Sequence, residues 1–331
     1  MLELADVAPH PQLPVNLLLA AVHHLLLEGA DDPLADSYDS VLDLRGIAVA
    51  PAAVPAEVLA DRFVSFCHDH ASEIIERLLT RATQTNEVGR CAVIAAALGH
   101  LRGLGHERVG LLDLGCSAGL NLFVDDYAYD YGGALVGPPD APLTISCELR
   151  GAVPDLAMPD IAARVGLDLS PVEVTDSDAT AWLLACLWPD NLARFRRLEA
   201  ALAHAAARRD DLVLVAGDMV RDLAGAASLV DGALHLVILD CWSACYLPIE
   251  DRPDLFDAVA DVSSRRPVSW ISMESPFAAR GIGVLAESLA LRHRGASVLT
   301  LTERDAGGPR SMLLGEVHSH GDWLDWRARE R

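Results

Sequence analysis

The sequence predicts an α/β fold in which a helical N-terminal domain precedes a Rossmann-like, mainly parallel sheet of seven strands. Three observations support this prediction. Apolar residues recur at helical spacing through the first hundred residues, short apolar runs alternate with helical stretches from residue 109 onward, and the last two runs lie too close together for a helix between them. We expect a helical domain at 1–105 and a Rossmann-like domain at 106–331.

Three helices are expected in the first domain. The run Leu13–Leu27 is apolar on every side but is interrupted by polar residues, so it predicts a buried helix and no membrane span. Apolar residues at 3.6-residue spacing predict a second helix over Pro55–Leu79, and a third is expected over about Asn86–Leu101. Gly103 and Gly105 then break the pattern and mark the domain boundary.

The second domain contains seven short apolar runs, each followed by turn residues. Because helical stretches alternate with most of them, these runs predict βαβ units and a parallel sheet. Only the segment Glu303–Gly308 separates the last two, so these should pair as an antiparallel hairpin. A segment rich in Gly, Pro and Tyr at about 127–162 is interpreted as an insertion. The seven runs are Val109–Leu114, Val165–Leu169, Leu212–Ala216, Leu234–Leu239, Val268–Met273, Val298–Thr302 and Met312–His318.

The composition excludes several classes of function. All 26 basic residues are arginine, which excludes Schiff-base chemistry and the lysine of a P-loop. With 48 acidic residues the net charge is -22, so we expect no nucleic-acid partner. Seven cysteines without a CxxC pair favour buried thiols in a reducing compartment. We therefore expect a cytoplasmic protein without a membrane partner.

The sharpest motif follows the first predicted strand and reads Asp113-Leu-Gly115-Cys-Ser117-Ala-Gly119. Small residues let the backbone approach a ligand closely, and a helix after them would present unpaired N–H groups. The motif does not match the G-x-G-x-x-G of an NAD-binding fold, because Ser117 replaces the middle glycine and the third spacing differs.

The same residues also match the nucleophile elbow of an α/β hydrolase, G-x-S-x-G. Ser117, Asp240 and His318 even follow one another in the order of that catalytic triad. However, an elbow normally follows several strands, and its oxyanion hole uses an N–H from an upstream strand–helix loop. The upstream hundred residues read as helical, so the hydrolase is kept as an alternative.

The loop further fits the acid-x-Gly-x-Gly-x-Gly pattern of methyltransferase domains, which tolerates a small residue in the middle. This interpretation predicts a site for S-adenosyl-L-methionine. Gly115, Ser117 and Gly119 would hold the methionine moiety, with Asp113 and Asn121 as further cofactor-binding residues.

Two later strands end in acids that extend this interpretation. Asp168 is expected to bind the ribose hydroxyls, because one carboxylate can accept both hydrogen bonds. About fifty residues separate it from Gly119, where about twenty are typical, so Glu148 remains an alternative. Asp218 is expected to accept a hydrogen bond from the adenine amine, and Met219 to pack on the ring.

Several strings along the chain carry a family resemblance. They are Arg81–Cys91, Ser117–Leu122, Tyr127–Gly132, Gly166–Leu169, Trp182-Leu183, Trp188-Pro189 and Trp270–Glu274. Together they resemble a bacterial family known as domain of unknown function 2332, and the string QTNEVGR within the first is the most specific. The resemblance spans nearly the whole chain. It implies a methyltransferase-like fold and assigns no substrate.

The QTNEVGR string supplies the first candidates for catalysis. One interpretation is a capped helix start with Thr85 or Asn86 as the N-cap. The functional alternative makes Asn86 and Arg90 substrate-binding residues and Glu87 the general base. Asp240 is the second candidate for the base. His23 is the third, although a histidine in an apolar helix is usually a core residue.

Tyr127 and Trp242 complete the predicted substrate contacts. Tyr127, Tyr129 and Tyr131 alternate as on one face of a strand, so packing in the core is an equal alternative. No metal is expected, because His and Cys ligands two apart on a helix point to different faces.

The sequence thus predicts methyl transfer from S-adenosylmethionine to an oxygen or nitrogen nucleophile of a small molecule. The N-terminal helices are expected to cover the site, and a homodimer is left open. The alternatives are a non-catalytic binder of an adenosyl cofactor and the hydrolase.

Overall fold

The computed structural model describes residues 14–48, 54–286, 289–305 and 308–328. The chain folds into two compact units, one of residues 1–86 and 173–202, the other of residues 87–172 and 203–331. The division therefore falls near residue 86 and not near 105, and a later segment returns to the N-terminal unit. The helix expected to end the first domain belongs to the second unit, because it is buried on nearly every side beneath the sheet.

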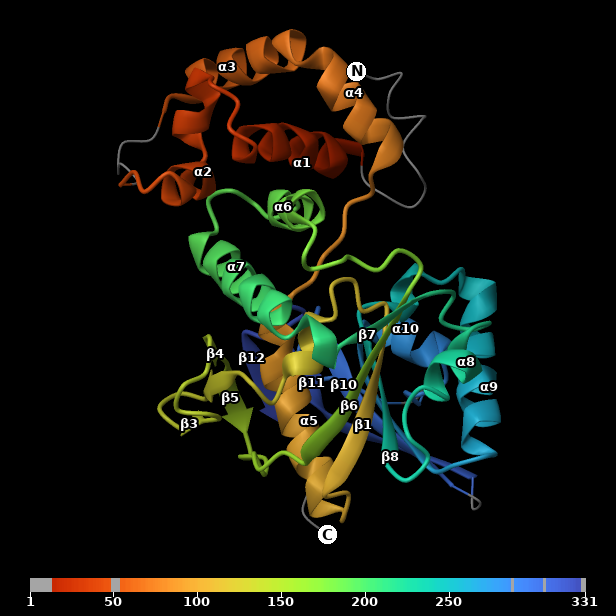
Figure 1. Cartoon of the computed structure of the whole chain (residues 1–331). Coiled ribbons are helices and arrows are strands. Elements are labelled where there is room, and N and C mark those ends of the chain that lie inside the picture. Colours follow the sequence, from red (N-terminus) through yellow and green to blue (C-terminus); the bar gives the residue numbers. More distant parts are fainter. Residues whose placement is uncertain (1–13, 49–53, 287–288, 306–307, 329–331) are drawn as a thin grey trace. The chain divides into compact units, whose positions relative to one another are not determined.

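The described residues of the first unit form helices and loops, without a strand (Figure 1). Its core joins Leu17, Phe66 and Trp182, and the Trp182 indole N–H donates to the carbonyl of Ala82 at 2.8 Å. The prediction of one helix over Pro55–Leu79 was wrong, because the chain breaks at His70. The elements are α1 (Pro14–Leu27), η2 (Pro33–Ser37), α2 (Asp39–Leu44), α3 (Ala56–Asp69), α4 (Ala71–Thr80), α6 (Ser177–Ala185) and the first part of α7 (Leu192–Ala207).

The second unit is built on a nine-stranded sheet with the order β5-β12-β11-β10-β9-β8-β1-β6-β7. All seven predicted strands are present, and two short strands not predicted, β5 and β12, extend one edge. The sheet therefore has nine strands and not seven. Their bounds are β1 (Arg108–Leu114), β5 (Glu148–Gly151), β6 (Asp160–Asp168), β7 (Val213–Ala216), β8 (His235–Cys241), β9 (Val268–Glu274), β10 (Ser297–Asp305), β11 (Gly308–Val317) and β12 (Trp323–Trp326).

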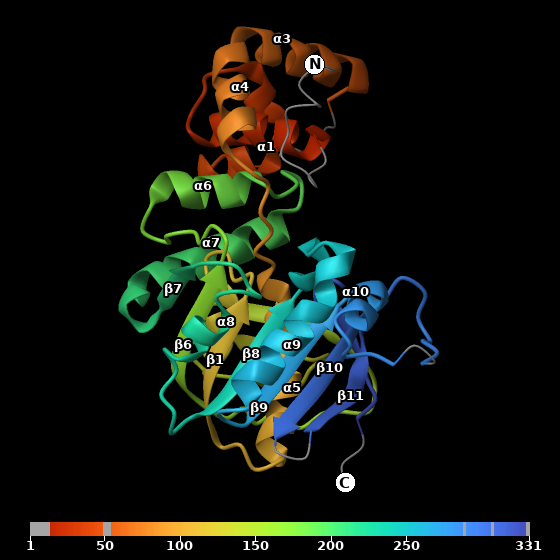
Figure 2. The same cartoon turned by 90° about the vertical axis from the view of Figure 1, so that its right-hand side faces the viewer.

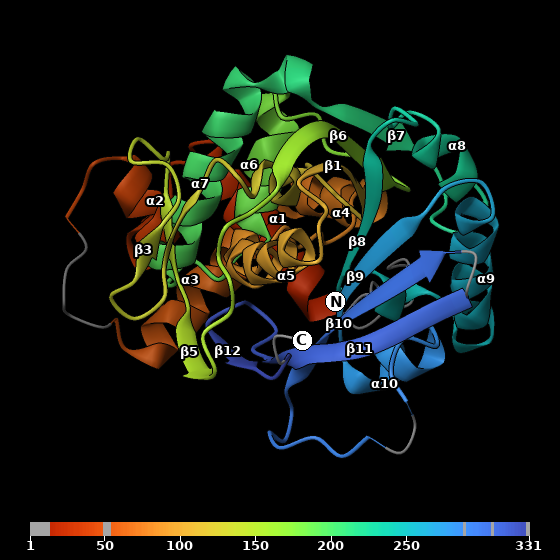
Figure 3. The ribbon, with the colours of Figure 1, turned by 90° about the horizontal axis from the view of Figure 1, so that it is seen from below.

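The sheet changes from parallel to antiparallel after β9. Strands β7, β6, β1, β8 and β9 pair in parallel, whereas β10 pairs antiparallel with both β9 and β11. The predicted β10–β11 hairpin is thus confirmed, and Figure 3 shows the two long strands side by side. Residues 306 and 307 of its turn lie outside the described residues.

Helices cover both faces of this sheet. α5 (Cys91–Gly103), preceded by the 3₁₀ turn η3 (Val88–Arg90), lies on one face (Figure 3). The other face carries α8 (Leu223–Ala227), α9 (Arg252–Ser263) and α10 (Pro276–Gly281), as Figure 2 shows. Leu112, Ile238 and Trp270 of the sheet pack into the core beneath this second group.

The first part of the predicted insertion forms a small sheet of its own, whereas its β5 joins the main sheet. Its strands are β2 (Ala128–Asp130), β3 (Leu135–Val136) and β4 (Thr144–Ser146), in the order β3-β2-β4. The hydroxyls of Tyr127, Tyr129 and Tyr131 donate to the backbone carbonyls of Leu120, Val124 and Ala92. All seven cysteines are unpaired, and no helix in the described ranges has the length and apolarity to cross a bilayer.

Candidate site at the carboxyl edge of the parallel strands

The parallel part of the sheet contains one topological switch point, between β1 and β8. From β1 the chain builds outward through β6 and β7, and then returns to the other side of β1 to add β8 and β9. In open α/β sheets, ligands bind outside the carboxyl ends of the strands at such a point. The loops that follow β1 and β8 touch there, since a Cβ on Gly115 would lie 2.5 Å from the Cβ of Ser243.

The glycine loop leaves β1 through three left-handed residues. Gly115, Ser117 and Gly119 have φ of 71°, 51° and 70°. Glycine adopts this region freely, whereas Ser117 is a strained exception at a functional candidate. The α-helix predicted after the loop is absent, and the chain instead makes the single 3₁₀ turn η4 (Leu120–Phe123). The N–H groups of Gly115, Ser117 and Gly119 donate to Leu167, Asp168 and Cys116, so they hold the loop against the end of β6.

Asp168 lies against the glycine loop. Its carboxylate accepts hydrogen bonds from the backbone N–H of Ser117 and of Ser170, both at 2.8 Å. Glu148, the alternative ribose ligand, begins β5 at the far edge of the sheet, six strands from β1, and is exposed and paired with Arg150. The geometry thus favours Asp168 over Glu148.

Asp218 and Met219 follow β7, beside the end of β6. The N–H of Gly217 donates to the carbonyl of Asp168 at 2.8 Å, which joins the two strand ends. The Asp218 carboxylate accepts from the N–H groups of Arg221 and Val220, and these bonds lower its pKa. The three predicted cofactor segments therefore follow one another along one edge, in the order β1, β6, β7.

Asp113 is a buried acid of this edge with a strongly raised pKa. It is only 2 % exposed, and its Oδ2 has no hydrogen-bond partner among the described residues. Burial first, and then the charges of Asp168 and Asp240, raise its pKa to about 8, against the opposing effects of Arg90 and Asn121. Asp113 therefore keeps its proton at neutral pH, and a cation or hydrogen-bond donor bound beside it would favour the ionised form.

Asp240 is the penultimate residue of β8 and is completely buried. Its Oδ1 accepts from the Ser243 hydroxyl at 2.7 Å and from the Ala244 N–H, and its Oδ2 accepts from the Ser272 hydroxyl at 2.8 Å. His318 pairs with Asp322 at 2.9 Å. The hydrolase triad is therefore not assembled, because its acid and its histidine are each engaged elsewhere.

The QTNEVGR string places Arg90 at this same edge. Its guanidinium donates to the carbonyls of Cys241 and Ser319, each at 3.0 Å, and lies 5.9 Å from the centre of the Trp242 ring. Trp242 has a φ of 58°, and its indole N–H donates to the Ser297 hydroxyl at 3.1 Å. Arg90 thus fixes the loop after β8.

Glu87 shares this neighbourhood and is buried. Its Oε1 accepts from the Gly89 N–H at 2.9 Å, and its Oε2 lies 3.6 Å from Nδ1 of His320. A capped turn begins here as one interpretation predicted, but the cap is the Glu87 side chain and not Thr85 or Asn86. Arg90 and Glu87 are therefore brought together, whereas Asn86 belongs to the other unit.

Two further predicted residues are occupied by structural contacts. His23, in the first unit, is buried; its Nδ1 lies 3.1 Å from the Ala185 carbonyl and its Nε2 2.7 Å from the Ser40 hydroxyl. Because a carbonyl only accepts, Nδ1 carries the proton and Nε2 accepts from Ser40. Burial lowers the pKa of His23 to about 4. This geometry, and the fully buried position of Tyr127, favour the core-packing alternatives.

Glu274 is the residue of this edge that sequence reasoning missed. It is the last residue of β9, one strand beyond Asp240, and it is completely buried. The signal was present, because Glu274 lies at the end of an apolar run, as Asp168 does, and Asp113 and Asp240 lie one residue before the end of theirs. Four acids from four neighbouring strands therefore converge at one edge.

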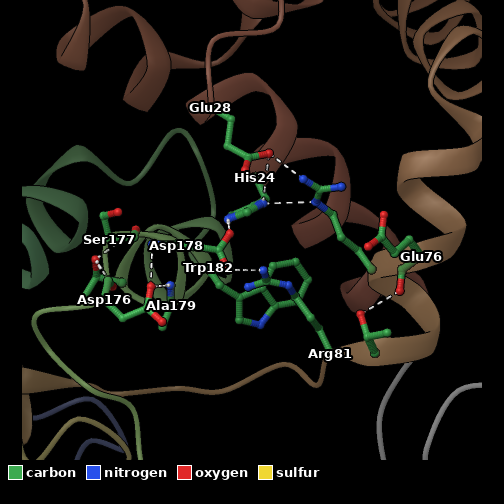
Figure 4. A network of polar contacts seen from close by, with 12 residues as sticks. His24, Glu28, Glu76, Arg81, Asp176, Ser177, Asp178, Ala179 and Trp182 are labelled. Atoms are coloured by element: carbon green, nitrogen blue, oxygen red, sulfur yellow. Dashed lines mark hydrogen bonds and ion pairs between the residues drawn. The ribbon is translucent and has the colours of Figure 1, made fainter.

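The first unit holds a separate polar cluster around His24 (Figure 4). His24, Glu28 and Asp178 lie close enough together to hold a metal ion. However, the two carboxylates are already paired with Arg77 and Arg81, and Arg77 Nε donates to His24 Nδ1 at 3.1 Å. The cluster is therefore explained as an ion-pair network that ties α1, α4 and α6 together.

Comparison with known proteins gives a family. A family model described as an uncharacterized protein conserved in bacteria (DUF2332) matches residues 1–326. No curated protein matches the chain. Among solved structures, the chain is similar to SAM-bound CalS10, an amino pentose methyltransferase from Micromonospora echinaspora involved in calicheamicin biosynthesis. The identity is 17%, the TM-score 0.25, and the match covers 73% of this chain and 80% of that chain. At that TM-score the likeness supports no functional conclusion.

Proposed function

The chain belongs to the bacterial family DUF2332, and from that starting point we propose that it binds S-adenosyl-L-methionine at the carboxyl edge of its parallel strands. The proposed reaction is methyl transfer to an oxygen or nitrogen nucleophile of a small molecule. The observation that carries the proposal is the switch point between β1 and β8, where a left-handed small-residue loop meets a row of strand-terminal acids.

The chemistry of these residues fits the cofactor. Asp113 presents a buried oxygen without a hydrogen-bond partner among the described residues, and the acids at this edge outnumber the nearby Arg90. An edge with this excess of acidic groups suits the positively charged ammonium and sulfonium groups of S-adenosylmethionine, which carries no phosphate. It would disfavour the pyrophosphate of NAD.

Each part of the cofactor has a candidate ligand in chain order. Asp113 would accept from the ammonium, while Gly115 and Ser117 would contact the methionine moiety. Asp168 would bind the ribose, because each of its oxygens has a second lone pair beyond the one used by the loop. Asp218 would lie nearest the adenine. When bound, the cofactor supplies a methyl group already activated by its positive sulfur.

The chain's own contribution is then to position an acceptor and to manage its proton. Asp240 is held immobile by three donors at the end of β8. Glu87 lies near the same edge, because Arg90, three residues further along the chain, donates to the Cys241 carbonyl at the end of β8. Glu87 itself contacts His320. Asp240 and Glu87 are thus the candidate proton acceptors among the residues predicted from the sequence.

Calorimetric titration of the purified protein with S-adenosylmethionine, S-adenosylhomocysteine and NAD tests the proposal. We expect micromolar binding of both adenosyl ligands, no binding of NAD, and at least tenfold weaker adenosyl binding after Asp168→Ala. Asp261→Asn, an exposed position on α9, is the matched control and should leave binding unchanged. Absence of adenosyl binding by the wild-type protein would refute the proposal.

The Glu87→Gln variant tests whether Glu87 takes part in catalysis, as an enzyme would require and a non-catalytic binder would not. Replacement of Glu87 by Gln keeps the shape of the side chain and its acceptor for the Gly89 N–H. In an enzyme that uses this carboxylate, turnover should fall while cofactor affinity stays within about twofold. Full turnover in Glu87→Gln would show that Glu87 takes no part in the reaction.

A further inference from the structure

A tight turn after β11 packs on the QTNEVGR string. It runs from His318 to Gly321, and the Gly321 N–H donates to the His318 carbonyl at 2.9 Å. Gly321 has a φ of 85°, and a Cβ on it would lie 2.1 Å from the carbonyl oxygen of Gly89, so a side chain would not fit there. The turn therefore lies directly against η3, and both belong to the second unit.

Arg90 fastens this turn to the carboxyl edge of the sheet. Its guanidinium donates to the Ser319 carbonyl in the turn and to the Cys241 carbonyl at the end of β8, each at 3.0 Å. Because one planar guanidinium makes both bonds, the two carbonyl oxygens lie close together. The loop that follows Cys241 in turn touches the glycine loop, where Ser243 meets Gly115. The turn thus lies at the edge where the cofactor is proposed to bind.

His320, within the turn, pairs with Glu87. Nδ1 of His320 lies 3.6 Å from Oε2 of Glu87, and both atoms are buried. The other oxygen of Glu87 accepts from the Gly89 N–H at 2.9 Å, which fixes the carboxylate. A separation of 3.6 Å is an ion-pair contact beyond hydrogen-bond distance, and catalytic contacts of this kind often shorten when a substrate binds.

The two members of this pair differ in exposure. The side chain of Glu87 is 3 % exposed, whereas that of His320 is 37 % exposed. Since Nδ1 is buried, the exposed part of His320 is the rest of the side chain, which includes Nε2. A small molecule can therefore reach this imidazole from solvent. The carboxylate that faces Nδ1 favours a proton on that nitrogen and leaves Nε2 as the basic atom of the ring.

The other histidine of the turn has a different setting. Nδ1 of His318 lies 2.9 Å from a carboxylate oxygen of Asp322, whose side chain is 63 % exposed. Because water screens an exposed ion pair, Asp322 holds the His318 ring only weakly. His318 is therefore a suitable comparison for His320, which has a buried and fixed carboxylate behind it.

We propose that His320 is the general base of the methyl transfer and that Glu87 positions it. The inference rests on the proposed function. Nε2 of His320 takes a proton from the hydroxyl or ammonium group of the acceptor, so an O–H or N–H bond breaks, an N–H bond forms on His320, and the electron pair stays on the acceptor atom. That pair forms the bond to the methyl carbon, while the carbon–sulfur bond breaks and its electrons return to sulfur, which loses its positive charge. Glu87 stays ionised and stabilises the imidazolium.

Turnover tests the role of His320. Formation of S-adenosylhomocysteine from S-adenosylmethionine is measured with a panel of small alcohols, phenols and amines. Because a general base contributes a factor of about 10² to 10⁴, His320→Asn should lower turnover about a hundredfold or more, with affinity for S-adenosylhomocysteine within about twofold. His318→Asn, which removes the other imidazole of the turn, is the matched control and should stay within about threefold of the wild type.

Two outcomes of this assay would count against different claims. Turnover of His320→Asn within about threefold of the wild type would overturn the inference. A wild type that binds S-adenosylhomocysteine and methylates no member of the panel would instead overturn the proposed methyl transfer.

The pH profile tests the positioning role of Glu87. Wild-type turnover should fall at acidic pH as His320 becomes protonated. Glu87→Gln removes the negative charge beside the ring and keeps an acceptor for the Gly89 N–H, so this acidic limb should move to lower pH by about half a unit or more. A Glu87 that only stabilises the fold would leave the limb in place, and an unmoved limb would overturn the inference.

Nuclear magnetic resonance of histidine labelled with ¹⁵N tests the pair without a substrate. At pH 8 we expect the neutral wild-type His320 to carry its proton on Nδ1, and this preference should weaken in Glu87→Gln. A proton on Nε2 in the wild type would overturn the inference, because that nitrogen could then not accept a proton.

Discussion

Replacement of Asp113 by Asn should stabilise the protein in a strongly pH-dependent way. The folded chain holds the pKa of Asp113 at about 8, above its ordinary value of 3.8. Between these values the folded state keeps a proton that the unfolded chain has lost, so the stability of the wild type falls as pH rises. Each pH unit corresponds to about 1.4 kcal/mol, which gives a penalty of about 4 kcal/mol at pH 7. The asparagine side chain carries no charge in either state and avoids this penalty.

The assay is urea-induced unfolding of both proteins at half-unit steps from pH 5.5 to 7.5, followed by tryptophan fluorescence. Four of the six tryptophans (242, 270, 323 and 326) lie in the second unit, so the signal reports mainly on its unfolding. We expect the stability advantage of Asp113→Asn to grow by about 1.4 kcal/mol per pH unit, with Asp261→Asn parallel to the wild type. Asp113→Asn should also bind S-adenosylhomocysteine at least tenfold more weakly than the wild type does. A stability difference that does not change with pH would refute the argument.

Three further changes test other parts of the account. In the wild type, the free energy of unfolding should fall by about 3 kcal/mol as pH drops from 6.5 towards 4, because the unfolded chain binds a proton that buried His23 does not. His23→Asn should remove this pH dependence, which unfolding at pH 5.5 and 7.5 measures. Arg90→Met should cost about 2 to 3 kcal/mol in thermal or urea unfolding and weaken cofactor binding, since it leaves two carbonyls without donors, and an unchanged midpoint would contradict this. A serine-directed fluorophosphonate should not label Ser117, because Asp240 and His318 are engaged elsewhere, and stoichiometric labelling detected by mass spectrometry would revive the hydrolase.

The strands were predictable because strands buried on both faces read as continuous apolar runs. β8 and β9 are of this kind, and their positions were predicted closely. β5 and β12 are only four residues each, and β5 is largely exposed. Their hydrophobic patterns are therefore too short to distinguish them from loops in the sequence.

Parts of the fold that depend on tertiary contacts were not predictable. Residues 173–202 join the N-terminal unit because Trp182 packs with α1 and donates to Ala82, and no local pattern encodes this. The helix expected after Gly119 is replaced by the 3₁₀ turn η4.

The candidate site was predictable where a motif marked a strand end. The loop at Gly115–Gly119 and the acids Asp168 and Asp240 were found by this rule. The choice between Asp168 and Glu148 needed the order of the strands. Glu274 obeyed the same rule and was overlooked, because only pairing of β9 with β8 shows that it shares an edge with Asp240.

Hydrogen exchange with and without S-adenosylhomocysteine tests the location of the cofactor site most directly. We expect slower exchange of backbone amides at the carboxyl ends of β1, β6 and β7, at residues 115–119, 168–170 and 217–219. The opposite edge of the sheet, where β8 and β9 begin at His235 and Val268, should not change. Protection confined to other segments, or none at saturating ligand, would contradict the account.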